Sequence, residues 1–275
     1  MLLSTEYGEV FASMEGPAEG LAVVFTHGIT MDHRTFAPQM EALSDAFRVI
    51  SWDLPSHGES FELAPEDFRF EFLARVFLEM LDGLGVDRAV LVGQSVASLF
   101  HQYVGWHHRD RVVGLVDIGG LPLHQPMSGP MLAIGKFGVS MTALLPEKSF
   151  YNWFANARSI KEETRAYMKE GISGFGKRAV IEMTQAYFKD QAEGIPAAPD
   201  LPLLIVNGVE EMGVVKKPAQ KWAQEVGARR VVIPDAGHIA NQDNPEGFAA
   251  AIREFLEEIV RKSGRNQEDQ AIRPQ

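Results

Sequence analysis

A serine in a very short turn is the first feature of this sequence that could perform chemistry. An apolar run over residues 89–92 ends at Gly93, and a helix-compatible run resumes at Val96. Ser95 must therefore lie on a tight turn between a strand and a helix. Gly93 and Ala97 stand two positions on either side of Ser95, where small residues leave room for the neighbouring backbone. The helix also directs unpaired amides and the positive end of its dipole toward the serine oxygen, so the pattern predicts that Ser95 is a nucleophile.

A structural interpretation of the same stretch is also open, in which the short pattern arises by chance and Ser95 caps a helix. Ser98 is the competing hydroxyl, but it lies inside the predicted helix rather than at its start, so we interpret it as structural. Ala97 stands where glycine is commoner and adds one methyl group where helix and strand pack closely. The strand, turn and helix around Ser95 favour the nucleophile.

A general base is the next group that such a nucleophile requires, and position selects one of the eight histidines. His238 follows a strand predicted over residues 230–233 and precedes a helix that Asn244 caps and Pro245 begins. It is therefore held in a loop between two well-defined elements. We predict that His238 is the base.

The other histidines fit structural roles better. His27 and His57 belong to tight loops, and His101 lies on the helix that follows Ser95. A metal site built from neighbouring His107 and His108 with Asp110 is disfavoured, because adjacent residues on a helix do not share a face. We expect no metal site.

Composition bounds the class of protein. The chain has 275 residues, of which 45% are hydrophobic, which suits one large core better than two equal domains. The net charge of -11 disfavours nucleic acid and anionic membranes as partners, and the absence of cysteine excludes a disulfide scaffold, a thiolate nucleophile and a cysteine-based zinc site. The first residues carry no basic start with a long apolar run, so we expect a cytoplasmic protein. The sequence does not decide between a monomer and a homodimer.

Strands and helices alternate along the first part of the chain. This alternation predicts an α/β fold with a mostly parallel central sheet flanked by helices. The predicted strands cover residues 9–14, 21–26, 48–52, 89–92 and 112–118. The predicted helices cover residues 36–43, 68–84 and 96–106.

The alternation breaks between residues 121 and 196, where the sequence predicts an inserted helical cap. Ser159 and Glu162 have the spacing of a capping box at the start of one of its helices. The core would then comprise residues 1–120 and 197–262, and the polar segment 263–275 is expected to be a disordered tail. The predicted cap helices cover residues 130–145, 150–158, 160–172 and 177–191. Residues of the cap that could line a lipophilic pocket, or only pack the cap onto the core, are Met131, Phe137, Met141, Phe150, Trp153, Phe154, Tyr167 and Phe175.

Three motifs together resemble the α/β-hydrolase fold family: His27-Gly28 after one strand, the segment 53–58 (Asp-Leu-Pro-Ser-His-Gly) after the next, and Gly93-Gln94-Ser95. The resemblance covers nearly the whole chain. It implies a serine, an acid and a histidine in that chain order, an oxyanion hole and an inserted lid. Ser56 stands where the family usually has glycine.

The resemblance also implies which residues complete the site. The acid would lie in the loop after the strand predicted over residues 201–206, at Glu211, although aspartate is commoner there. Glu210 and Asp117 remain alternatives for the acid, and an ordinary surface carboxylate is also open. The oxyanion hole would be formed by the backbone N–H groups of Ile29 and Val96.

These residues predict a serine hydrolase that cleaves a small lipophilic carboxylic ester through an acyl-enzyme, with no metal and no organic cofactor. The same residue types support C–C bond hydrolysis, lactone opening or cofactor-free perhydrolysis. A ligand-binding protein with vestigial activity is the alternative from another class, because a fold does not fix a function.

Overall fold

One twisted sheet organises the chain. The computed structural model describes residues 1–271, with side chains as far as residue 263. The strand order is β1-β2-β4-β3-β5-β6-β7-β8, in which β1 and β2 pair antiparallel and the others run parallel. The strands are β1 (Leu2–Thr5), β2 (Gly8–Glu15), β3 (Ala22–Thr26), β4 (Arg48–Trp52), β5 (Ala89–Gln94), β6 (Val112–Ile118), β7 (Leu203–Gly208) and β8 (Arg229–Ile233).

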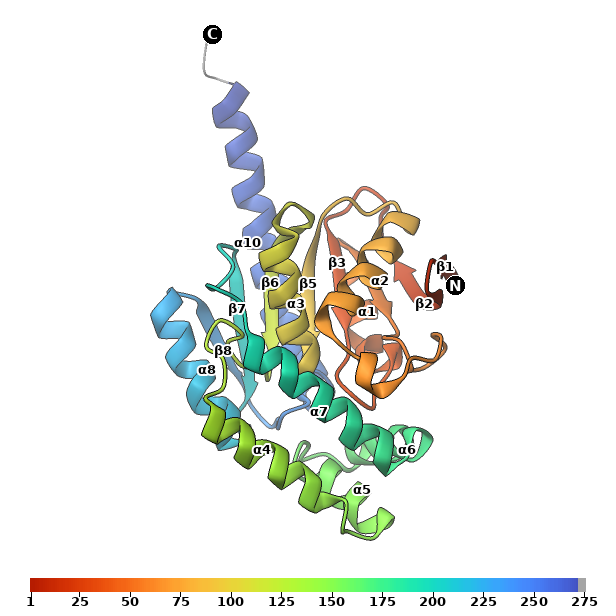
Figure 1. Cartoon of the computed structure of the whole chain (residues 1–275). Coiled ribbons are helices and arrows are strands. Elements are labelled where there is room, and N and C mark those ends of the chain that lie inside the picture. The colour runs from red at the N-terminus through yellow and green to blue at the C-terminus, as the bar shows by residue number, and fades with distance from the viewer. Residues whose placement is uncertain (272–275) are drawn as a thin grey trace.

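Helices cover both faces of this sheet (Figure 1). In β3, Val24 packs into the core under α2 and α3, whereas Val23 and Phe25 pack into the core under α1 and α10. This alternation is the period of two that a strand buried on both faces requires. The α-helices outside the segment between β6 and β7 are α1 (Ala37–Leu43), α2 (Phe70–Gly83), α3 (Val96–His107), α8 (Gly213–Val226), α9 (Ala240–Asp243) and α10 (Pro245–Ala271).

The expected fold class is confirmed, and two strands, β4 and β6, have the predicted bounds. Of the strands and α-helices in the described chain, three were not predicted: β1, α8 and the short helix α9. β1 is a short edge strand of four residues, and α8 contains Pro218. The buried positions Val215, Ala219 and Trp222 of α8 do follow the helical period, so that spacing was a usable signal.

Four helices lie between β6 and β7, and we call this segment the helical insertion. Figure 1 shows its four helices together at one end of the sheet. They are α4 (Gly129–Thr142), α5 (Glu147–Asn156), α6 (Glu162–Phe175) and α7 (Lys177–Glu193).

The predicted capping box at the start of α6 is wrong. Lys161 occupies the N-cap position, and no side chain caps the helix there. The hydroxyl of Ser159 instead donates a hydrogen bond of 2.5 Å to Asp243, far away in the sequence. The same hydroxyl accepts a hydrogen bond of 3.0 Å from the Lys161 N–H, one residue before the Glu162 N–H that a capping box requires.

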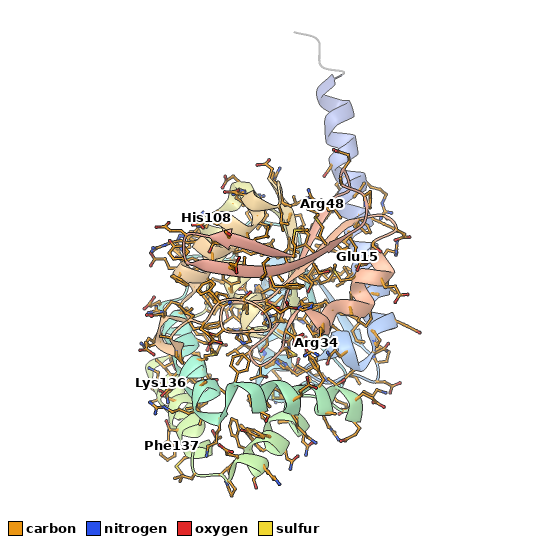
Figure 2. All side chains as sticks on the ribbon, turned by 90° about the vertical axis from the view of Figure 1, so that its right-hand side faces the viewer. Glu15, Arg34, Arg48, His108, Lys136 and Phe137 are labelled. Atoms are coloured by element: carbon orange, nitrogen blue, oxygen red, sulfur yellow. The ribbon has the colours of Figure 1, made fainter. Side chains whose placement is uncertain are left out.

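Several apolar residues of the insertion point to solvent rather than inward. Met131 is 58% exposed, Phe137 67%, Met141 45% and Trp153 46%. Figure 2 shows Phe137 on the outer side of the insertion. These four side chains are therefore excluded from an internal pocket, whereas Phe154 is buried.

The last helix begins as predicted: the Gly247 N–H donates a hydrogen bond of 2.9 Å to the side chain of Asn244. The helix continues to Ala271, across most of the segment where we expected a disordered tail from residue 263. Residues 272–275 of that expected tail lie outside the described residues. Among the helices that the structure describes, none is both long and apolar enough to span a membrane.

A neutral histidine is buried beneath the Ser95 turn. Trp52 donates a hydrogen bond of 2.8 Å to the hydroxyl of Thr26, and this hydroxyl lies 2.8 Å from Nε2 of His101. A hydroxyl has one proton and two lone pairs, so that of Thr26 can accept from Trp52 and also form a hydrogen bond with the neutral ring of His101. Burial lowers the pKa of His101 to about 3.

This pKa predicts a pH-dependent stability. Between pH 6.5 and about 3 the unfolded chain binds a proton at His101 that the folded chain does not, so the free energy of unfolding falls as the pH is lowered. From pH 7.5 to 5.0, we expect this residue to account for about 2 kcal/mol of the loss. Urea unfolding of the wild type and His101→Gln at both pH values measures it. An equal loss in both proteins would contradict the prediction.

Candidate active site

Ser95 occupies a strained turn between β5 and α3. Its φ of 57° and ψ of -118° lie outside the regions that residues with a side chain normally adopt. The Ser95 N–H donates a hydrogen bond of 2.8 Å to the carbonyl of Ile118. A Cβ at Gly93 would lie 2.6 Å from the backbone of Ala97, so only glycine allows the helix to approach the strand here. Every residue from 89 to 100 is buried except Ser95, which this turn presents to the outside of the sheet.

Ser98 has the structural role that its position indicated. Its hydroxyl donates a hydrogen bond of 2.6 Å to the carbonyl of Ser95. This bond stabilises the turn and engages the Ser98 oxygen.

His238 and Glu211 form a buried pair. Nδ1 of His238 lies 3.0 Å from Oε1 and 3.2 Å from Oε2 of Glu211. Because an ionised carboxylate only accepts hydrogen bonds, Nδ1 carries the proton and Nε2 is left free to accept one. Burial alone would raise the pKa of Glu211, but its interactions with His238 and a 2.9 Å hydrogen bond from the Met212 N–H hold that pKa below its usual range.

The pair has room only because residue 119 is glycine. Gly119 follows β6 with a φ of +62°, and a Cβ there would lie 2.7 Å from Nδ1 of His238 and 3.0 Å from Oε2 of Glu211. The backbone of Gly119 is therefore packed against the hydrogen bond between the two side chains.

The helical insertion holds the loop that carries His238. The carbonyl of Arg158 accepts hydrogen bonds from the N–H groups of His238 (2.7 Å) and Ile239 (3.2 Å). Asp243 accepts one from the Gly237 N–H (2.8 Å) and one from the hydroxyl of Ser159. The position of the histidine is thus set by both the sheet and the insertion.

A cavity of about 100 Å³ brings the predicted groups together. Ser95, His238, Ile29 and Val96 all line it, and Glu211 lies behind His238. In the described part of the chain, neither the Ile29 N–H nor the Val96 N–H donates to a backbone carbonyl in a turn, loop or helix cap. Both are thus available to a ligand in the cavity.

The insertion supplies the opposite wall of this cavity. Of the insertion residues that we expected to line a pocket, Phe154 does so. Sequence reasoning missed Arg158 and Tyr187, whose direction depends on how the insertion packs. The remaining lining residues are Met31, Gln94, Met168, Thr184 and Ile239. Met31 also lines a second cavity of about 500 Å³, beside α6.

Two buried histidines fix the loop that carries Ile29. Nε2 of His27 accepts a hydrogen bond of 3.1 Å from the Leu54 N–H, and Nε2 of His57 accepts one of 3.2 Å from the Thr30 N–H. Burial lowers the pKa of both rings, that of His57 to about 3, so both are neutral acceptors.

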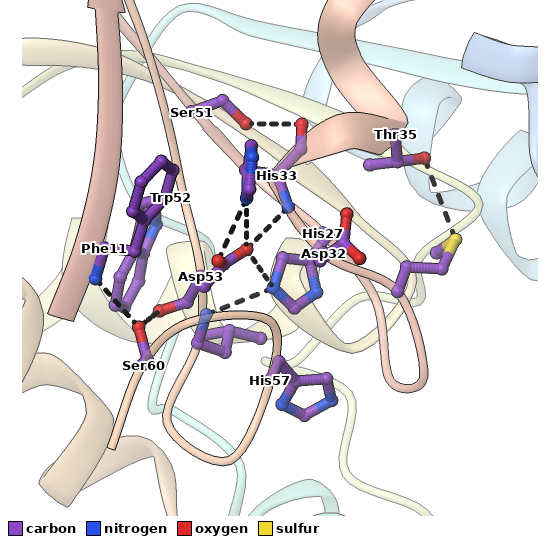
Figure 3. A network of polar contacts seen from close by, with 12 residues as sticks. Phe11, His27, Asp32, His33, Thr35, Ser51, Trp52, Asp53, His57 and Ser60 are labelled. Atoms are coloured by element: carbon purple, nitrogen blue, oxygen red, sulfur yellow. Dashed lines mark hydrogen bonds and ion pairs between the residues drawn. The ribbon is translucent and has the colours of Figure 1, made fainter. Parts of the chain in front are cut away.

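Asp53 connects this loop to the rest of the fold (Figure 3). Its carboxylate accepts hydrogen bonds from the His33 N–H (2.6 Å), the His33 ring (2.9 Å) and the Glu59 N–H (3.0 Å). Ligand atoms of Asp32, His33 and Asp53 lie within 4.8 Å of one another, the spacing of a possible cation site. The carboxylate of Asp53 is already occupied by these donors, so the cluster is accounted for as a brace of the loop.

The two alternative candidates for the acid, Glu210 and Asp117, are not hydrogen-bonded to His238 in the described structure. Glu210 is exposed. Asp117 is buried and accepts hydrogen bonds of 2.9 Å from Gln102 and from the Gly120 N–H, where the chain leaves β6 for the insertion. Burial raises the pKa of Asp117 to about 7, against these hydrogen bonds. Within the described residues, no hydrogen bond joins either acid to His238.

Comparison with known proteins establishes the family. The profile of the alpha/beta hydrolase family matches residues 23–251, most of the chain. The chain therefore belongs to the alpha/beta hydrolase family, and this membership supports hydrolase activity.

Individual relatives are distant but match over nearly their full length. The chain is 21% identical to 3-oxoadipate enol-lactonase 1 of Acinetobacter baylyi over 261 residues, 94% of this chain and 97% of the relative. It is 25% identical to 2-succinyl-6-hydroxy-2,4-cyclohexadiene-1-carboxylate synthase of an Enterobacter species, covering 85% and 91% of the two chains. Among solved structures, a thermophilic esterase from Thermogutta terrifontis has the same fold, with a TM-score of 0.75, 24% identity and coverage of 92% and 94%.

The packing of Gly119 against the His238–Glu211 bond generates a prediction. Gly119→Ala should displace this bond and slow the labelling of Ser95 by a fluorophosphonate by about tenfold or more. Gly85→Ala is the matched control, because Gly85 has a similar φ of +64° but nothing within 4 Å of an added Cβ. Both variants should lose comparable melting temperature from the backbone conformation. Equal labelling rates in the two variants would show that the contact at Gly119 has no effect on Ser95.

Proposed function

We propose that this protein is a serine hydrolase that cleaves a carboxylic ester bond in a small substrate through an acyl-enzyme intermediate. One observation carries the proposal: the buried hydrogen bond between His238 and Glu211, beside the cavity that Ser95 lines. The bond leaves Nε2 of His238 free to accept a proton, and Ser95, which lines the same cavity, is held in a strained, accessible turn.

The proposed reaction uses these three side chains in sequence. Nε2 of His238 takes the proton of Ser95 while the serine oxygen attacks the ester carbonyl. Glu211 stabilises the imidazolium that forms. His238 then gives the proton to the departing alcohol, which leaves the acyl group on Ser95. A water molecule, deprotonated by His238, attacks this acyl group, and His238 then gives the proton to the serine oxygen as the acid is released.

The negative oxygen of each tetrahedral intermediate would be stabilised by the N–H groups of Ile29 and Val96. Both residues line the cavity. The loop of Ile29 is braced by neutral, buried His27 and His57, so this donor needs no rearrangement during the reaction. Removal of one such donor typically costs 10²- to 10³-fold in kcat.

The helical insertion would act as a cap that determines the substrate. It contributes Phe154, Met168 and Tyr187 to a cavity whose volume of about 100 Å³ is small for a ligand site. A small acyl group fits a cavity of this size, and Phe154 and Met168 suit the carbon chain of that group.

A lactone is a second candidate substrate. It is a cyclic ester, so the same steps open the ring while the alcohol stays attached to the acyl group. The name of one relative, 3-oxoadipate enol-lactonase 1, favours this candidate.

We expect Ser95→Ala to lower kcat for 4-nitrophenyl butyrate at least ~10³-fold without loss of folding, because only the attacking oxygen is removed. Ser98→Ala is the control and should stay within a few-fold of the wild type. Hydrolysis is followed by nitrophenol release, and the opening of δ-valerolactone is followed by titration of the acid. Near-normal turnover of both compounds by Ser95→Ala would refute the serine mechanism. If the wild type cleaves neither compound and a fluorophosphonate does not label Ser95, the protein is a binder rather than a hydrolase.

The identity of the acid is tested by three variants that remove a charge and keep the shape. Glu211→Gln should cost 10²- to 10⁴-fold in kcat, because the imidazole loses its ionic partner. Glu210→Gln should have little effect, since this side chain is exposed. Asp117→Asn should lower the melting temperature more than kcat. A large loss of kcat in Asp117→Asn with nearly normal turnover in Glu211→Gln would identify Asp117, on β6, as the acid.

A further inference from the structure

A cation lines the same small cavity as Ser95. Arg158 follows α5 and is partly buried, with its side chain at the cavity wall beside His238 and Phe154. Burial lowers the pKa of Arg158 to about 10, against the attraction of Glu211, so the guanidinium remains charged at neutral pH. A charge that is partly removed from water is destabilised unless an opposite charge or a hydrogen-bond acceptor compensates it.

The protein itself supplies little of that compensation. Within the described residues Arg158 forms no ion pair at 4.0 Å or less, unlike Arg34 and Arg69. Its side chain makes one hydrogen bond, from Nη1 to the carbonyl of Phe154 at 3.0 Å. A guanidinium has five N–H donors, so most of its hydrogen-bonding capacity remains available.

Glu211 is not a hydrogen-bonded partner of Arg158. Both of its oxygens face His238, and one also accepts the Met212 N–H. Glu211 therefore attracts Arg158 from a distance while its hydrogen-bonding sites are engaged elsewhere.

The guanidinium is held in a defined orientation. Its central carbon lies 3.5 Å from the centre of the Phe154 ring, a close cation–π contact. The backbone carbonyl of Arg158 accepts hydrogen bonds from the His238 and Ile239 N–H groups. Arg158 is thus fixed relative to the proposed base.

We propose that Arg158 binds a carboxylate of the substrate, so that the ester or lactone cleaved at Ser95 is a monoester or lactone of a short dicarboxylic acid. This inference rests on the proposed function and adds the substrate class. A planar carboxylate accepts two parallel hydrogen bonds from a guanidinium, which matches the free donors of Arg158. The apolar side chains of Phe154, Met168 and Ile239 also line the cavity and suit the short carbon chain between the two acyl groups.

Two esters with one leaving group test this substrate class. 4-Nitrophenyl hydrogen glutarate carries a terminal carboxylate, and 4-nitrophenyl hexanoate is a neutral ester of similar length. The wild type should prefer the glutarate ester at least ~10-fold in kcat/KM. Arg158→Gln should lower this preference about 30-fold or more. Arg158→Lys should retain part of it, because an ammonium keeps the charge but cannot donate two parallel hydrogen bonds to one carboxylate.

Arg178→Gln is the matched control. Arg178 lies on α7 of the same insertion, is exposed and pairs with Glu182, so its loss should leave the preference unchanged. Melting temperatures of all variants show whether each is folded. The inference is overturned if the wild type cleaves both esters equally, or if Arg158→Gln loses activity on both by the same factor.

Binding separates this inference from the proposed function. Glutarate should raise the melting temperature of Ser95→Ala, relative to sodium chloride of equal ionic strength, and should not do so for Ser95→Ala with Arg158→Gln. If the wild type cleaves neither ester but this shift depends on Arg158, the proposed hydrolysis fails and the carboxylate site stands. If the esters are cleaved through Ser95 but glutarate produces no Arg158-dependent shift, the carboxylate site fails and the hydrolase stands.

Discussion

The strained backbone of Ser95 is the constraint on which the rest of the site depends. A residue with a side chain in such a conformation costs about 1–3 kcal/mol and persists only where its surroundings enforce it. Here the close contact of Gly93 with Ala97, the hydrogen bond to the Ile118 carbonyl and the Ser98 hydroxyl enforce it. The conformation places the serine oxygen above the carboxyl edge of the sheet, where neighbouring strands deliver the other groups. In sheet order these are Ile29 after β3, Ser95 after β5, Gly119 after β6, Glu211 after β7 and His238 after β8.

The helical insertion is bonded to both loops that carry the predicted chemistry. The Arg158 carbonyl holds the His238 loop. On the other side, the Tyr167 hydroxyl donates a hydrogen bond of 2.9 Å to the Asp32 side chain, and Gly171 packs so tightly that a Cβ would lie 1.9 Å from the Thr30 carbonyl oxygen. Residues that recognise the substrate are therefore positioned by the same contacts that position the base and the oxyanion loop. A change in the insertion should alter turnover as well as substrate preference.

The sequence predicted those features that depend on local order. Apolar runs located β4 and β6 because a strand buried on both faces is mostly apolar. The small residues around Ser95 predicted the turn because strand and helix approach too closely there for larger side chains. Features that depend on distant contacts were missed. Ser159 and Glu162 predicted a local capping box, although Ser159 binds Asp243. Phe137 was expected either to line a pocket or to pack onto the core, although it is exposed. Arg158 gave no signal at all, because its role comes from meeting the His238 loop in space.

The central claim is that Ser95 carries the acyl group, and chemical trapping tests it most directly. The protein is mixed with 4-nitrophenyl acetate, quenched with acid within the first turnover, digested and analysed by mass spectrometry. We expect one acetyl group on Ser95, in an amount equal to the initial burst of nitrophenol. Turnover without an acyl group on Ser95, or with the acyl group on another residue such as His238, would contradict it.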